Sequence, residues 1–155
     1  MTTHSQEELN EIWNSILDGK YGTDPLVIAP RRIAAETGTE IMSIPNATGT
    51  DVFVYERNSG EQWRGVTYKW PDWPTVQSAL ESPKFKWRTI EGIVKETKLD
   101  AVTVTGNMSA NAALIIKSTI PDKDGRVLFT TKDHYREKSS LWERLESAIT
   151  NKVQK

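Results

Sequence analysis

Residues 87–109 read WRTIEGIVKETKLDAVTVTGNMS, and this stretch decides the fold. Thr89 is a favourable N-cap residue, and the apolar residues after it recur at helical spacing. Residues 98–99 supply a turn, and Asp100 caps a second segment that runs to about Ser109. The stretch therefore predicts a helix, a turn and a second helix.

The flanking residues extend this pattern on both sides. Residues 75–82 predict a short helix, and residues 85–88 predict a short strand. After the second capped helix, residues 113–120 and 126–131 predict two strands, and the Pro121–Gly125 segment between them has the composition of a tight turn. The predicted order is three helices followed by a two-stranded hairpin.

This order resembles a bacterial winged-helix module that often lies at the C-terminal end of larger proteins. The resemblance is carried by Trp87–Leu99, Ile120–Arg126 and Thr130–Tyr135, and it covers about residues 75–150, half of the chain. In that family a short amphipathic helix tends to follow the wing, as Leu141–Ile149 does here. The resemblance implies a fold much more than a function.

Two positions depart from the family pattern. Lys98 stands where the turn usually has a glycine in the left-handed conformation, which costs a non-glycine residue on the order of 1 kcal/mol. Val94 stands where the close helix–helix contact usually has alanine, and Gly92 offers relief from that crowding. We expect the fold to tolerate both changes.

The first half of the chain matches no family pattern but predicts regular structure. Ser5 and Glu8 form a capping box at the start of an amphipathic helix. Residues 30–38 predict a two-turn helix, with proline in its first turn and glycine at its end. Residues 52–57 and 63–70 alternate in polarity like the two strands of a hairpin, with a turn at Asn58–Gly60.

The sequence as a whole predicts an α+β fold. It consists of an N-terminal helix and β-hairpin region (residues 1–74), followed by a winged-helix domain with a closing C-terminal amphipathic helix (residues 75–155). Residues 1–78 carry a net charge of −5 and residues 79–138 a net charge of +3, so the chain is acidic first and basic second. Such asymmetry is a weak sign of a surface for an acidic partner.

Composition excludes several classes of protein. The absence of cysteine excludes disulfides and thiolate metal sites. No run approaches the roughly 20 apolar residues that a membrane helix needs, and no signal peptide is visible, so we expect a soluble, cytoplasmic protein without membrane contact.

No pattern of catalytic residues stands out. The two histidines, His4 and His134, are far apart in the sequence, and no glycine-rich phosphate loop occurs. We expect no enzymatic activity, no catalytic or metal-ligating residues, no cofactor and no small-molecule substrate.

Binding to double-stranded DNA, in transcription or defence, is one hypothesis for function. In a helix-turn-helix domain the second helix of the motif enters the major groove, but here no Lys or Arg occurs from Leu99 through Ile116. Side chains of the wing and its surroundings still supply hydrogen-bonding and basic groups. The candidate DNA contacts are Lys86, Arg88, Thr103, Asn107, Lys117, Lys123, Arg126 and Lys132.

The hypothesis that we favour is a non-enzymatic protein-interaction or regulatory module, in a bacterial or phage setting that only the resemblance suggests. The chain has six tryptophans, and two of them, at positions 70 and 73, flank prolines in a segment that looks like a linker. We expect a partner protein or a second copy of the chain as the ligand. The candidate contacts are Trp70, Trp73, Met108 and Trp142.

Overall fold

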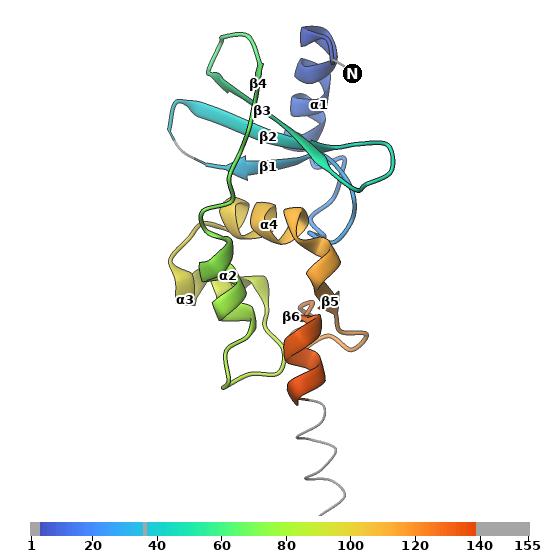
Figure 1. Ribbon diagram of the computed structural model, residues 1–155, viewed down its shortest axis with the longest axis vertical. Coiled ribbons are helices and arrows are strands. Elements are labelled where there is room, and N and C mark those ends of the chain that lie inside the picture. Colours follow the sequence, from blue (N-terminus) through green and yellow to red (C-terminus); the bar gives the residue numbers. More distant parts are fainter. Residues whose placement is uncertain (1–3, 36, 139–155) are drawn as a thin grey trace, which may run out of the picture.

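The computed structural model describes residues 4–35 and 37–138 (Figure 1). Its helices are α1 Gln6–Leu17, α2 Trp73–Leu80, α3 Ile90–Thr97, α4 Ala101–Ala110 and the short 3-10 helix η1 Ala112–Leu114. Its strands are β1 Arg31–Ala34, β2 Thr39–Pro45, β3 Val52–Asn58, β4 Arg64–Val66, β5 Ile115–Lys117 and β6 Phe129–Thr131. Residues 132–138 are also helical. The α+β class expected from the sequence is confirmed.

The first half of the chain forms a four-stranded antiparallel sheet in the order β1-β2-β3-β4. The pairing of β3 with β4, which places Val54 opposite Val66, confirms the predicted hairpin, but the return strand is only Arg64–Val66 and does not reach residue 70. The helix predicted for residues 30–38 is wrong, because residues 31–34 form β1 and pair with β2. A cross-strand partner and the complete burial of Ile33 outweigh the local helix signals there.

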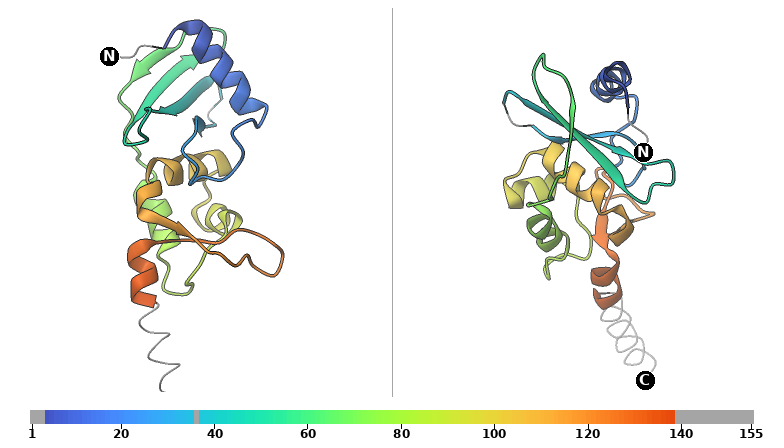
Figure 2. Two further views of the ribbon diagram at one scale, coloured as in Figure 1. Left: turned by 90° about the vertical axis from the view of Figure 1, so that its right-hand side faces the viewer. Right: turned by 45° about the horizontal axis from the view of Figure 1, so that its top comes forward.

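Helix α1 covers one face of this sheet (Figure 2). The predicted capping box is present, since the Ser5 hydroxyl accepts a hydrogen bond from the Glu8 amide at 3.1 Å. Leu9 and Trp13 are buried against the sheet, and the Trp13 and Trp63 rings lie 5.3 Å apart between centroids. The amphipathic face that the sequence predicts is therefore the face that packs.

Helix α4 covers the opposite face (Figures 1 and 2). Its Gly106 lies so close to β1 that a Cβ atom there would come within 2.9 Å of the Ile33 Cα. A side chain at this position would collide with backbone, which explains why a residue with poor helix propensity stands in the middle of α4. The close contact joins the two halves of the chain.

A second core lies between α2, α3, α4 and the β5–β6 hairpin. Its buried members are Val76, Ala79, Leu80, Ile93, Val104, Met108, Ile115 and Phe129. The predicted short strand at residues 85–88 appears as a bridge, in which the Arg88 and Phe129 backbones exchange hydrogen bonds of 2.8 and 2.7 Å. The hairpin is thereby fixed to the chain that precedes α3.

The predicted helix boundaries around the turn are confirmed. The Thr89 hydroxyl accepts from the Gly92 amide at 3.0 Å, and the Asp100 carboxylate accepts from the Thr103 amide at 2.7 Å. Lys98 adopts the left-handed conformation, with a φ of 62°. The turn thus takes the geometry that usually calls for glycine.

The boundary predicted at residue 74 falls inside α2, which begins at Trp73. Helix α4 belongs to the second core, and its Gly106 lies against Ile33 of β1, so packing does not separate the chain at that boundary. The predicted helix Leu141–Ile149, with its candidate contact Trp142, lies outside the described residues.

Candidate binding surfaces

The middle of α4 is buried at Val104 and at residues 106–108, and its other residues are half-buried or exposed. Val104, Asn107 and Met108 are fully buried, because the helix lies between β1 on one side and α2 and α3 on the other (Figure 1). The side-chain amide of Asn107 donates to the Thr103 carbonyl at 2.8 Å, within the same helix. Asn107 as a DNA contact and Met108 as a partner contact are therefore wrong. Thr103 remains half-buried.

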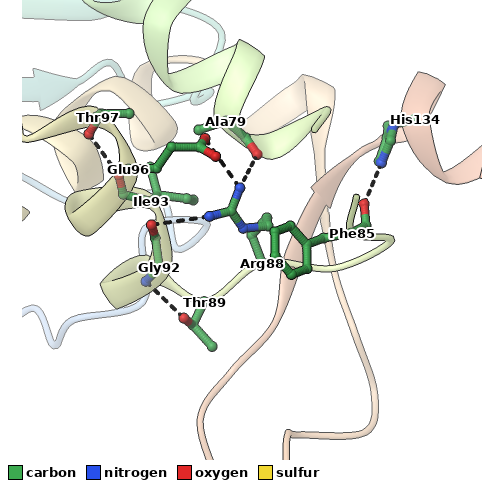
Figure 3. A network of polar contacts seen from close by, with 9 residues as sticks. All are labelled: Ala79, Phe85, Arg88, Thr89, Gly92, Ile93, Glu96, Thr97 and His134. Carbon is green, nitrogen blue, oxygen red and sulfur yellow. Dashed lines mark hydrogen bonds and ion pairs between the residues drawn. The ribbon is translucent and has the colours of Figure 1, made fainter. Parts of the chain in front are cut away.

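Arg88 is a structural residue and not a DNA contact. Its side chain is 8% exposed, and Figure 3 shows how it joins three segments. The guanidinium donates to the Ala79 carbonyl at 2.8 Å and the Gly92 carbonyl at 3.1 Å, and it pairs with Glu96 at 3.3 Å. These bonds connect the end of α2 to the start of α3 and occupy the guanidinium within the fold. The prediction that Arg88 contacts DNA is therefore wrong.

The basic residues of the wing are largely paired with acids. Lys117 lies 2.8 Å from Asp24, and Arg126 lies 2.9 Å from Asp122 and 3.1 Å from Asp124. The pKa of Asp122 is lowered, first by the Arg126 backbone amide and then by further hydrogen bonds within the turn. These pairs reduce the positive charge that the wing offers to phosphates, although Lys117, Lys123 and Arg126 are all exposed.

Trp70 lies where two hollows adjoin. One has a volume of about 480 Å³ and is lined by residues 26–29, the β2–β3 turn and the end of α4. The other, of about 530 Å³, lies between residues 51–55 and residues 65–70. Asp51, Val52 and Trp70 line both, and we call the combined depression the Trp70 groove.

One wall of the Trp70 groove is an open strand edge. Strand β4 pairs only with Val54–Glu56 of β3, and after Val66 the chain leaves the sheet. Beside this opening, the Val52 amide donates to the carboxylate of its neighbour Asp51 at 2.8 Å. The Trp70 ring packs edge-on against the ring of Tyr68, with 4.8 Å between centroids.

The opposite wall is a loop held in place by a buried arginine. Arg31 donates to the carbonyls of Gly22 (2.6 Å), Asp24 and Val27. Burial lowers the pKa of Arg31 and the nearby Asp24 carboxylate raises it, with a net lowering. Val27 is 50% exposed and Ile28 is 65% exposed, so this wall presents apolar side chains to solvent.

The sequence identified only part of this groove. It pointed to Trp70, whereas the second linker tryptophan, Trp73, is half-buried against the C-terminal core. It missed the open edge at Val52 because an edge depends on where β4 ends. The apolar run at residues 26–29 was the only sequence signal for the second wall.

Two predicted basic contacts, Lys86 and Lys132, lie on another surface. It is formed by the loop 83–87 and the helical segment 132–138, which meet where a ring nitrogen of the buried His134 lies 2.7 Å from the Phe85 carbonyl oxygen. Lys132 is exposed and Lys86 is half-buried.

Within residues 4–35 and 37–138, no group of three or more His, Asp or Glu side chains is placed to hold a metal ion. No helix in that part of the chain is long and apolar enough to span a bilayer. Comparison with protein-family models, with curated proteins and with solved structures found no match to this chain.

Proposed function

We propose that this protein is a non-enzymatic interaction module of the winged-helix type, which binds an extended segment of a partner protein in the Trp70 groove. The observation that carries the proposal is the open edge of β3 beside the Trp70 groove, in a molecule whose α4 is used for internal packing. A regulatory role in a bacterial or phage setting is what the winged-helix resemblance adds.

Strand addition is the binding mode that fits this groove. A peptide that pairs with an open sheet edge gains main-chain hydrogen bonds, and its alternate side chains enter pockets along the strand. Here those side chains would meet Val52 and Trp70 on one side and the exposed Val27 and Ile28 on the other. The net charge of −5 on residues 1–78 favours a neutral or basic peptide.

The order of α2, α3, α4 and the β5–β6 hairpin supports a winged-helix type of fold for the second half. In that fold α4 would be the helix that enters DNA. Because the N-terminal sheet lies on this helix, the geometry favours a protein ligand over duplex DNA.

The proposal is tested by selecting peptides from a displayed random library on the full chain and measuring their affinity by fluorescence anisotropy. Trp70→Ala removes the ring, and Val52→Pro removes the amide at the open edge, which donates to the side chain of Asp51. We expect each change to weaken the selected peptides at least about tenfold, as for residues at the centre of an interface.

The matched control is Val127→Ala, which shortens an exposed apolar residue on the wing. It should leave peptide affinity unchanged. Selected peptides that bind the wild type, Trp70→Ala and Val52→Pro equally would refute the groove as the site, as would a selection that enriches no peptide.

A further inference from the structure

A second surface, which shares no residue with the Trp70 groove, combines basic and aromatic side chains. It is built from the loop 83–87 and the helical segment 132–138. The Lys138 ammonium connects these two segments by donating to the Pro83 carbonyl at 2.6 Å. We call it the basic–aromatic platform. Its working residues are Lys84, Phe85, Lys86, Lys132, Tyr135 and Arg136.

The platform is positively charged in a chain whose net charge is −1. Its two segments hold five Lys or Arg residues and two acids, a local net charge of +3. Of the two acids, Asp133 lies 3.8 Å from Arg136 in a largely exposed pair, which solvent screens. Among the residues that the structure describes, Lys84, Lys86 and Lys132 form no ion pair with a carboxylate, in contrast to Lys117 and Arg126 of the wing.

The aromatic rings of the platform are held rigidly and remain accessible. Phe85 is 47% exposed, and its ring lies over the Arg88 guanidinium at 4.6 Å (Figure 3). Because Arg88 is fixed by α2 and α3, the ring has a fixed support. Tyr135 is 38% exposed, and its ring lies between Trp87 at 5.5 Å and the Lys86 ammonium at 5.2 Å.

We infer that the basic–aromatic platform binds single-stranded nucleic acid. Phe85 and Tyr135 are exposed aromatic rings on whose faces unpaired bases stack, and Lys84, Lys132 and Arg136 contact the phosphates. Stacking requires bases that are not already stacked in a duplex, so the exposed rings favour a single strand over double-stranded DNA. This activity is independent of the Trp70 groove.

The test is fluorescence anisotropy of the full chain with a labelled mixed-sequence single strand of about 20 nucleotides, which exceeds the site of one small binding domain. The same sequence is also measured as a duplex, and both probes are measured at about 0.05 M and about 0.2 M salt. We expect the single strand to bind more tightly than the duplex and to weaken as salt increases.

Two kinds of variant separate stacking from charge. Phe85→Leu keeps an apolar side chain and removes the ring, and we expect about a tenfold loss of affinity, whereas Phe85→Trp should retain binding. The double change Lys84→Gln with Lys132→Gln should weaken binding and lower the salt slope by about 1.4, the value for two phosphate contacts to a single strand. Thermal unfolding by circular dichroism checks that each variant is folded.

The matched control is Lys123→Gln with Arg126→Gln, which removes the same charge from the wing and should change the affinity little. Four results would overturn the inference. The first is no binding of the single strand at low salt. The second is equal affinity for the duplex and the single strand together with no effect of Phe85→Leu, and the third is a loss of affinity in the wing control as large as in the Lys84→Gln, Lys132→Gln variant. The fourth is that the protein binds anionic lipid vesicles but does not bind the oligonucleotide.

Discussion

At the scale of single residues, Gly106 sets how closely α4 approaches the sheet. Replacing a helical glycine by alanine normally gains about 1 kcal/mol. Here the added Cβ would lie 2.9 Å from the Ile33 Cα, and overpacking of this kind costs about 1–3 kcal/mol. We predict that Gly106→Ala lowers the free energy of unfolding by about 1 kcal/mol in urea denaturation.

Gly92→Ala in α3 is the control for this prediction. There the nearest atom to the added Cβ is the Thr89 hydroxyl at 3.2 Å, and no backbone atom is among the close contacts. Gly92→Ala should therefore lower the free energy of unfolding less than Gly106→Ala does. A gain in stability for Gly106→Ala would show that the sheet and α4 separate easily.

Lys98 stores strain in the turn between α3 and α4. Its φ of 62° is costly for a residue with a Cβ, and its side chain is exposed. We predict that Lys98→Gly raises the free energy of unfolding by up to about 1 kcal/mol, partly offset by the greater freedom of glycine in the unfolded chain. Lys98→Val should lower the free energy of unfolding. Thermal melts measure both variants, and a change in the same direction for both would contradict the prediction.

At the scale of elements, the ion pair of Lys117 with Asp24 joins β5 to the loop that forms one wall of the Trp70 groove. Burial raises the pKa of Asp24, but the hydrogen bonds from Lys117 and the Leu26 amide and the attraction of Lys117 and Arg31 outweigh it, so the net pKa is lowered. A lowered carboxyl pKa stabilises the fold above the unfolded-state value of about 3.9, and the stabilisation is lost as pH falls through the folded-state pKa.

The corresponding prediction concerns pH dependence. The difference in urea midpoint between the wild type and Asp24→Asn should be present at neutral pH and should vanish as the pH falls below about 4. The exposed pair is screened by solvent, so the difference should be small and should decrease with salt. A difference that persists at pH 3 would assign the effect to packing of the loop and not to the charge of Asp24.

At the scale of the whole molecule, α4 makes the two halves of the chain interdependent. One of its faces belongs to the C-terminal core through Val104 and Met108, and its Gly106 face lies on β1. Removing the first half would expose this second face to water and lose its burial. We therefore expect the full chain to unfold in one cooperative transition.

A fragment that starts at residue 70 tests this expectation. It should melt at a lower temperature than the full chain and should bind a dye for exposed apolar surface, because the β1-facing side of α4 is uncovered. Circular dichroism and dye fluorescence give the two readouts. A fragment as stable as the full chain, without dye binding, would mean that the contact between α4 and β1 contributes nothing.

By itself, the sequence determined the features that depend on neighbours within about one helical turn. The caps at Ser5, Thr89 and Asp100 follow from side chains that meet the backbone three residues away. The left-handed turn at Lys98 follows the end of α3, where its backbone amide donates to the Val94 carbonyl. These features predicted the order of helices in the second half and the α+β class.

Tertiary structure alone decided which surfaces remain free. Residues 31–34 became a strand because β2 lies beside them, and Arg88 and Met108 were buried by segments from other parts of the chain. An arginine or a methionine reads the same in the sequence whether it faces water or a core, since burial depends on contacts with residues distant in the chain. For the same reason, the Trp70 groove and the basic–aromatic platform exist only once those segments have packed.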